Sequence, residues 1–229
     1  MVNNSDITVI EVKENILADN DKEAEKVRAM LKEHGIFLVN LMSSPGAGKT
    51  TTLVRTIGAL KEKYRIGVIE ADVDSDVDAS TVTAAGAEAI QIHTGGSCHM
   101  DAEMTAKGLE SMNTDALDLI FLENVGNLVC PAEFDVGQNA RVMILSVPEG
   151  DDKPLKYPLI FKVSDLLLVN KTDTAPVFDF DMDRLRANVA ALNPDMPVIP
   201  VSAKSGDGFG DWIRWLDEAV TKYRADRTE

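Results

Sequence analysis

The sequence predicts an α/β protein in which a mostly parallel sheet of about seven strands is flanked by helices. Short, almost continuous apolar runs recur from residue 36 onward, which is typical of strands buried on both faces. Segments with helical spacing separate these runs, as they do in the crossovers of parallel sheets. A glycine-bearing loop joins the first run to such a segment, and ligands of open parallel sheets bind beyond the carboxyl ends of the strands. The runs cover residues 36–42, 65–70, 88–93, 117–123, 140–147, 165–170 and 196–202.

Composition and charge exclude several classes of function. The chain has 229 residues and a formal net charge of −15, which argues against nucleic acid or an anionic membrane as its main partner. No apolar run approaches the roughly 18 residues that a membrane helix needs. The first residues lack a basic segment followed by an apolar one, so no secretory signal is expected. Two cysteines do not make a disulfide framework, and we expect a cytoplasmic protein with reduced thiols.

The first part of the chain reads as a separate amphipathic helix. Residues 11–34 are rich in charge, and their apolar positions have helical spacing. The apolar positions are Ile16, Ala24, Val27 and Leu31, and Gly35 follows as a stop signal. We therefore expect an N-terminal helical arm over 1–34 and one α/β domain over 35–229. The arm either packs on the domain, which the pattern favours, or docks a partner.

The loop after the first strand has the features of a phosphate-binding loop. Gly46 and Gly48 allow the backbone to wrap closely around an anion, and the following helix directs N–H groups toward it. Lys49 would reach the β- and γ-phosphates, and the Thr50 hydroxyl would bind Mg²⁺. Ser43 stands where this motif usually has its first glycine. The residues expected to contact nucleotide are Pro45, Gly46, Ala47, Gly48, Lys49, Thr50 and Thr51.

An acidic run follows the second strand. Carboxylates occupy every second position from 70 to 78. At the carboxyl end of the strand, Asp72 is the best candidate to bind Mg²⁺ or its water, and Asp78 is a weaker one. Asp74 and Asp76 are expected to be solvated.

The fourth strand ends with Glu123 and, three residues later, Gly126. At this point of a phosphate-binding-loop fold, the pattern resembles a γ-phosphate sensor. The Gly126 N–H would bond the γ-phosphate and release it after hydrolysis, and Glu123 would hold Mg²⁺ through water.

The sixth strand is followed by the sequence N-K-T-D, which predicts recognition of guanine. Asp173 can accept hydrogen bonds from the guanine N1–H and N2–H₂ groups, which adenine lacks. The stem of Lys171 can cover the base, and Asn170 can tie this loop to the phosphate-binding loop. After the last strand, Ser202, Ala203 and Lys204 would cap the guanine O6 with a backbone N–H. Together with the preceding motifs, this order predicts GTP as the ligand.

Both cysteines lie beside these motifs. Cys98 and His99 occupy a glycine-rich loop before a helix expected to begin near Asp101, and Cys130 lies four residues beyond Gly126. Thiolate and imidazole suit Zn²⁺ or Ni²⁺, and a two-fold dimer would bring two such sets together. The alternative is that the cysteines are small core residues. The remaining histidines, His34 and His93, have no nearby ligand and are expected to be structural.

Taken together, the motifs resemble the hydrogenase nickel-incorporation GTPase family from about residue 10 to the end. The most specific segments are SSPGAGKTT, TGGSCHMDAEM, ENVGNLVCPAEFD, SVPEGDDKPLKYP, NKTD and VSAKSGDGF. The resemblance implies GTP hydrolysis with Mg²⁺, a homodimer formed on GTP binding, and delivery of Ni²⁺ to the large subunit of [NiFe]-hydrogenase. It also implies a Zn²⁺/Ni²⁺ site between subunits, made here by Cys98, His99 and Cys130.

The sequence also departs from the family pattern. No cysteine precedes Cys98 and there is no histidine-rich tract, so a partner chaperone is expected to supply the metal rather than a store in this chain. Lys49, Asp72 and Gly126 are the expected catalytic residues, and slow turnover is expected because no glutamine is obviously placed to orient water. Lys153 is a candidate to reach the nucleotide across the dimer.

A coupling between the two sites follows from the spacing. GTP would fix Gly126 and the loop that carries Cys130, and hydrolysis would then reshape the metal site.

Two other functions fit part of the pattern. The urease-accessory nickel GTPases share the fold but space their metal-binding Cys and His by a proline, whereas Cys98 and His99 are adjacent. A non-catalytic metal carrier would use GTP only as a structural switch. A partition-type ATPase is disfavoured because it needs a lysine where this chain has Ser44 and lacks the N-K-x-D sequence.

Overall fold

A computed structural model of the chain describes residues 12–72 and 77–227. Its seven strands form one sheet, and every neighbouring pair is parallel, which confirms the predicted fold class. The order across the sheet is β3-β2-β4-β1-β5-β6-β7. The strands are β1 (Phe37–Ser43), β2 (Ile66–Asp72), β3 (Glu88–His93), β4 (Leu119–Glu123), β5 (Ala140–Ser146), β6 (Leu166–Asn170) and β7 (Val198–Pro200).

The strand order determines which loops become neighbours. Since β1 lies between β4 and β5, the loop after β1 is flanked by the loops after β4 and β5. The register pairs Leu41 of β1 with Glu123 of β4, and Glu70 of β2 with the same Glu123. All carboxyl ends therefore point to one edge of the sheet, where the predicted motifs lie.

The last strand is shorter than the run that predicted it. Residues 196–202 form a mostly apolar run, but only Val198–Pro200 pair with β6. Pro197 and Pro200 have no N–H to donate to a neighbouring strand, and β7 is the edge strand of the sheet, where proline is tolerated.

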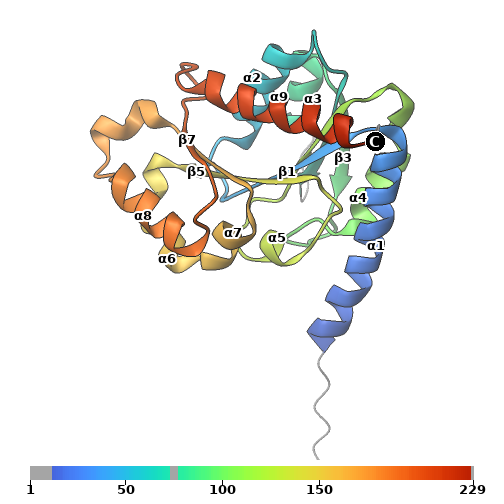
Figure 1. Cartoon of the computed structure of the whole chain (residues 1–229), viewed down its shortest axis with the longest axis horizontal. Helices are drawn as coiled ribbons and strands as arrows, with labels where there is room; N and C mark the ends of the chain where they lie inside the picture. Colours follow the sequence, from blue (N-terminus) through green and yellow to red (C-terminus); the bar gives the residue numbers. More distant parts are fainter. Residues whose placement is uncertain (1–11, 73–76, 228–229) are drawn as a thin grey trace, which may run out of the picture.

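Helices cover both faces of the sheet (Figure 1). On one face, α2, α3 and α9 pack against apolar side chains such as Phe121, and Trp212 donates a hydrogen bond to the Thr56 hydroxyl at 2.9 Å. The other face carries α1 and α4 over β2 and β4, and α7 and α8 over β5 and β6. The longer helices are α1 (Val12–His34), α2 (Lys49–Leu60), α3 (Val77–Ala85), α4 (Ala102–Glu110), α8 (Met182–Leu192) and α9 (Phe209–Asp226). The shorter ones are α5 (Cys130–Glu133), α6 (Lys153–Lys156) and α7 (Pro158–Val163), with 3-10 turns at Thr114–Ala116, Val147–Glu149 and Thr172–Val177.

The N-terminal helix packs on the domain. Ala24, Val27 and Leu31 are buried, as their spacing predicts, and α1 lies along α4. Asn20 bridges three segments, because its Nδ2 donates to the Asp135 carbonyl at 2.8 Å and its Oδ1 accepts from the Ala102 N–H at 2.9 Å. Ile16 is the exception to the apolar pattern, with 52% of its surface exposed.

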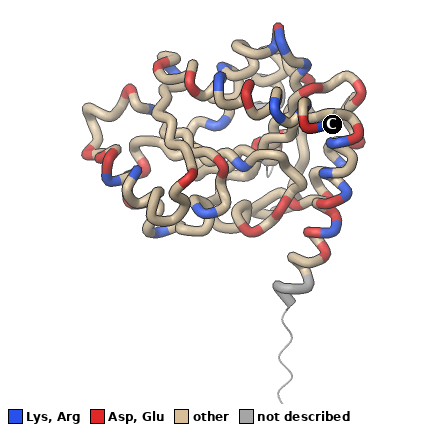
Figure 2. The backbone as a smooth tube through the Cα atoms, in the orientation of Figure 1, with Lys and Arg blue, Asp and Glu red and all other residues tan. Residues whose placement is uncertain are grey.

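Charged residues mark the outward face of α1. Figure 2 shows acidic and basic positions of both signs following one another along this helix. Lys22 pairs with Asp19 and Lys26 with Glu23, each three residues apart and exposed. Such pairs contribute little to stability, so the buried apolar residues hold the helix in place. Across the described residues, no helix is both long and apolar enough to traverse a lipid bilayer.

Candidate functional site

The loop between β1 and α2 has the predicted glycine conformations. Gly46 and Gly48 have φ angles of 73° and 98°, which favour glycine. A Cβ on Gly48 would lie 2.5 Å from the Asn170 Nδ2, so this position also needs glycine for space. The first helical residue is Lys49, which leaves the N–H groups at the start of α2 available to an anion.

Ser43 replaces a glycine of the motif without disturbing it. The residue ends β1 and is fully buried. Its Oγ accepts a hydrogen bond from the Lys49 Nζ at 3.1 Å and donates one to the Ser44 carbonyl at 2.7 Å. The hydroxyl thus gives the lysine a partner within the loop.

The predicted Mg²⁺ ligands are partly assembled. Thr50 Oγ1 donates a hydrogen bond to Glu123 Oε1 at 3.0 Å, and Glu123 is only 5% exposed. Hydroxyl and carboxylate oxygens are the donor set that Mg²⁺ prefers, so the residues fit the ion. Asp72 ends β2, and Asp78 lies in α3. Asp74 and Asp76 of the acidic run fall outside the described residues.

Glu70 is a second acidic residue of this site, and the sequence pattern predicted no role for it. Glu70 is 3% exposed and lies beside Glu123 on the neighbouring strand. Both share a cavity of about 290 Å³ with Lys49, Pro45 and Gly126. Two adjacent buried carboxylates repel each other unless a cation lies close, and the Lys49 ammonium or a bound Mg²⁺ meets that need. The alternation of β2 was the available signal, because Glu70 follows Val68 on the face toward α2.

The two predicted guanine-binding loops meet the phosphate-binding loop. The Asn170 Nδ2 donates to the Ala47 carbonyl at 2.9 Å, and its Oδ1 accepts from the Ala203 N–H at 3.0 Å. The Lys171 Nζ donates to the Gly46 carbonyl at 2.6 Å. A cavity of about 230 Å³ lies between these loops, lined by Gly48, Thr51, Asn170, Lys171, Asp173, Thr174, Ala203 and Lys204.

The carboxylate of Asp173 is held in place from the opposite loop. Ser202 Oγ donates to Asp173 Oδ1 at 2.7 Å and accepts from the Ser205 N–H at 3.1 Å. Arg55 of α2, absent from any motif, fixes the same loop, because it donates to the carbonyls of Ala203 and Lys204 at 2.7 and 2.9 Å. Nothing in the sequence marks Arg55, since its partners are backbone atoms almost 150 residues away.

The three predicted metal ligands come together within one chain. Their ligand atoms all lie within 4.8 Å of one another. Cys98 and His99 come from the loop before α4, where Asp101 caps the helix, and Cys130 is the first residue of α5. The two Sγ atoms are 3.0 Å apart, and Cys98 Sγ lies 3.8 Å from His99 Nδ1. We call these residues the Cys–His–Cys triad.

The electrostatic environment favours a neutral imidazole. Burial lowers the pKa of His99 below its usual value, although the carboxylates of Asp101 and Glu133 oppose this. The ring also stacks on Phe134, with centroids 3.8 Å apart. For Cys130, the hydrogen bond with the Cys98 thiol raises the pKa, and burial adds to this effect. A divalent cation would offset that cost, because metal binding favours deprotonated ligands.

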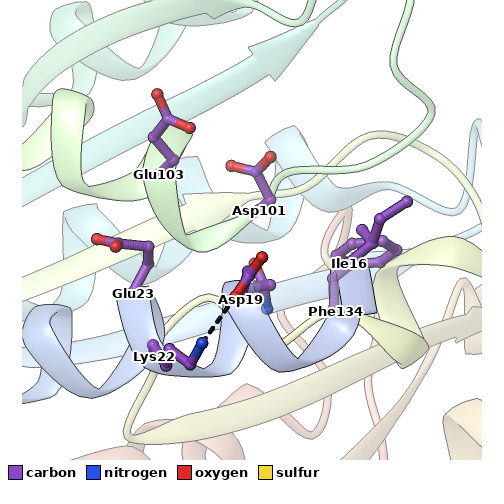
Figure 3. A pocket seen from close by; sticks show the side chains of 8 residues that line it. Ile16, Asp19, Lys22, Glu23, Asp101, Glu103 and Phe134 are labelled. Carbon is purple, nitrogen blue, oxygen red and sulfur yellow. Dashed lines mark hydrogen bonds and ion pairs between the residues drawn. The ribbon is translucent and has the colours of Figure 1, made fainter. Parts of the chain in front are cut away.

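An acidic cavity of about 640 Å³ lies between α1 and the start of α4 (Figure 3). Asp19 and Glu23 of α1 line it from one side, and Asp101 and Glu103 line it from the other. Phe134 contributes to its wall and also stacks on His99. Four carboxylates and one ammonium, that of Lys22, therefore line this cavity.

Lys153 does not reach the nucleotide cavities of its own chain. It begins α6, and its Nζ lies 5.3 Å from the centre of the Tyr157 ring. The preceding Asp151 is buried and paired with Arg184 at 2.7 Å, which fixes the start of this segment. Likewise, His34 lies outside the triad and pairs with Asp115 at 3.0 Å.

Comparison with known proteins identifies a family and several relatives that resemble this chain. The family described as "CobW/HypB/UreG, nucleotide-binding domain" matches residues 37–200. The hydrogenase maturation factor HypB of Azotobacter vinelandii is 46% identical over 95% of this chain and 72% of its own length. The crystal structure of HypB from Helicobacter pylori in complex with nickel superposes with a TM-score of 0.85 at 34% identity, covering 89% of this chain and 96% of that one. HypB from Archaeoglobus fulgidus gives 0.84 at 41% identity, covering 89% and 100%.

Proposed function

The protein belongs to the CobW/HypB/UreG family and, within it, to the hydrogenase maturation factors, and from this premise we propose that it is a GTP-hydrolysing nickel metallochaperone. In this proposal it binds Ni²⁺ or Zn²⁺ where two copies meet and assists nickel insertion into the large subunit of [NiFe]-hydrogenase. The observation that carries the proposal is the connection of two sites by a few residues. Gly126 lines the cavity with Lys49, and Cys130 of the triad follows four residues later.

The residues divide the work on GTP between them. The loop from Pro45 to Gly48 and the start of α2 would bind the phosphates, while Asp173 reads the guanine edge. Lys49 neutralises charge on the β- and γ-phosphates. Thr50 and Glu123 would hold Mg²⁺, which supplies charge neutralisation on the phosphates when it is bound. Turnover by one chain alone is expected to be slow, because the described residues that line the cavity around Lys49 and Gly126 include no arginine or glutamine.

Exposed apolar residues support a dimer at the triad. Val129, Leu155 and Leu159 are 48%, 69% and 40% exposed, although monomer surfaces rarely gather such side chains. They belong to the region of α5, α6 and α7, in which α7 contacts both α5 and α6. Cys98 is itself exposed. A second copy seated here would cover the apolar residues, join two triads, and bring Lys153 of α6 toward the partner's nucleotide.

The dimer is expected to depend on the nucleotide. With GDP we expect sedimentation at the chain mass of 24.9 kDa, and with a non-hydrolysable GTP analogue and Ni²⁺ at twice that mass. Nickel content measured on the same samples should rise with the dimer. One mass with both nucleotides would rule out a nucleotide-dependent dimer. A single-turnover hydrolysis assay separates a GTPase from a metal carrier that uses GTP as a structural ligand.

Replacing Asp173 by asparagine is expected to weaken GDP binding by about 10- to 100-fold, which corresponds to about 1–3 kcal/mol for a mismatched buried hydrogen-bond partner. The amide would present an N–H to the guanine N1–H or N2–H₂ group. Xanthine nucleotides carry a carbonyl at position 2, so their affinity should rise in the variant.

Isothermal titration with GDP, ADP and xanthosine diphosphate measures the change in base preference. The exposed Asp195 replaced by asparagine is the matched control and should bind like the wild type. Unchanged discrimination in Asp173→Asn would show that the base is read elsewhere.

A further inference from the structure

One side chain holds together the two loops that carry the cysteines. Asn127 follows Gly126 directly and is half-buried. Its Nδ2 donates a hydrogen bond to the Cys98 carbonyl at 3.2 Å, and its Oδ1 accepts one from the Val129 N–H at 2.9 Å. The first bond reaches the loop before α4, and the second shapes the turn that leads into Cys130. The same carboxamide therefore contacts the backbone next to both cysteines.

Through these two bonds Asn127 contacts the backbone beside each cysteine of the triad, while it contributes no ligand of its own.

Another asparagine, three residues earlier, shows what a purely structural link looks like. Asn124 is 1% exposed, and its Oδ1 accepts from the N–H groups of Met100 and Val125 at 3.1 and 2.9 Å. Its Nδ2 donates to Asn40 Oδ1 at 3.1 Å within β1. The bases of the two loops are therefore tied in the core. Asn127 joins their tips, next to the cysteines.

On its other side, Asn127 adjoins the nucleotide loop. A Cβ on Gly126 would lie 2.9 Å from the Pro45 nitrogen, so the backbone of residue 126 lies directly against the phosphate-binding loop. If the γ-phosphate draws the Gly126 N–H toward itself, the next residue has to follow, because the intervening peptide is planar and rigid. The displacement then reaches the Cys98 carbonyl and Val129 through one side chain.

We propose that Asn127 is the positioning residue that makes the geometry of the Cys–His–Cys triad depend on the nucleotide. The inference rests on the proposed function, in which Gly126 senses the γ-phosphate and the triad binds nickel. The Asn127 carboxamide is the link between the γ-phosphate sensor and the triad. With GTP the carboxamide holds Cys98 and Cys130 in one arrangement, and after hydrolysis the two loops relax to another, so nickel affinity differs between the states.

The test is the nickel Kd of the full chain with GDP and with a non-hydrolysable GTP analogue. The measured quantity is the ratio of the two nickel Kd values. Couplings between sites commonly change an affinity by about fivefold or more, and we expect a ratio of at least this size in the wild type. In Asn127→Ser the short hydroxyl can still accept from the Val129 N–H, but it cannot reach Cys98. We expect its ratio to fall to within about twofold of one. The ultraviolet thiolate-to-nickel charge-transfer absorption should likewise stop changing with the nucleotide.

Two further variants keep the experiment decisive. Asn127→Gln carries the same donor and acceptor on a longer stem and should restore part of the ratio, which a merely structural role would not predict. If Asn127→Ser does not fold, the intermediate ratio of Asn127→Gln decides. Asn113→Ser changes an exposed asparagine whose side chain makes no capping hydrogen bond, and it should behave as the wild type.

The outcomes distinguish a failure of the role of Asn127 from a failure of the proposed coupling between nucleotide and nickel. A wild-type ratio near one would overturn the proposed coupling and this inference together. A ratio above fivefold that persists in both Asn127→Ser and Asn127→Gln would overturn the role of Asn127 alone. Loss of the ratio in Asn113→Ser as well would show that the effect is not specific to this side chain.

Discussion

Replacement of Lys49 by alanine is expected to lower the rate of GTP hydrolysis by about 10²- to 10³-fold, the effect typical of removing one group that stabilises transition-state charge. The ammonium lies in the cavity shared by Glu70 and Glu123 and is held 3.1 Å from the Ser43 hydroxyl. Its loss would leave the two carboxylates facing the phosphates of GTP without a protein cation between them. Single-turnover release of phosphate at saturating GTP and Mg²⁺ measures the rate.

The matched control is Lys222→Ala, which removes an exposed lysine of α9. It should hydrolyse GTP at the wild-type rate. A thermal unfolding curve in the presence of GDP shows whether Lys49→Ala is folded. Full activity in folded Lys49→Ala would refute the assignment of the loop from Ser43 to Thr50 as the phosphate-binding site.

Removal of either cysteine is expected to abolish stoichiometric nickel binding while GTP binding stays within about twofold of the wild type. Loss of a residue that only supports a metal ligand costs about 10- to 100-fold in affinity, so loss of a ligand should cost at least about 100-fold. Cys98→Ala and Cys130→Ala each leave two of the three ligand atoms that now lie within 4.8 Å. Equilibrium dialysis of reduced protein against Ni²⁺, followed by elemental analysis, gives the stoichiometry.

The histidines of the chain supply an internal control for the same experiment. His99→Ala should lose nickel as the cysteine variants do, because the ring nitrogen belongs to the triad. His93→Ala removes an exposed histidine at the end of β3, outside the triad, and should retain nickel. Nickel retained at full stoichiometry in both cysteine variants would place the metal site elsewhere.

Most of the fold could be predicted because the strands are buried on both faces. Each of the seven apolar runs overlaps a strand, and the helical segments between them require a parallel arrangement. The order of the strands could not be predicted, since β1, β4 and β5 carry equally apolar side chains that do not specify their neighbours. Likewise, the apolar spacing of α1 placed Ala24, Val27 and Leu31 correctly. It also included Ile16, which lines a surface cavity with Phe134 and stays 52% exposed.

The site divides along a similar line. Short motifs identified Asn170, Lys171 and Asp173, and the structure brings them to the phosphate-binding loop as expected. Residues that act through backbone atoms carry no such signature. Arg55 bonds to two backbone carbonyls, and Asn127 bonds to one carbonyl and one N–H. Every residue except proline has both groups, so the sequence contains no signal that identifies these partners. The roles assigned to the motif residues stay predictions until the variants are measured.

The exposed triad also has a kinetic consequence. Three protein ligands leave coordination positions of a bound ion open toward solvent. If the triad binds nickel as proposed, a ligand from an acceptor would be able to join the ion before a cysteine departs, and the ion would pass on by associative exchange. Residence time and affinity would then be separable, because an ion bound tightly at equilibrium would still leave quickly when an acceptor arrived. A partner copy that fills the open positions would lengthen the residence time, and its dissociation would shorten it again.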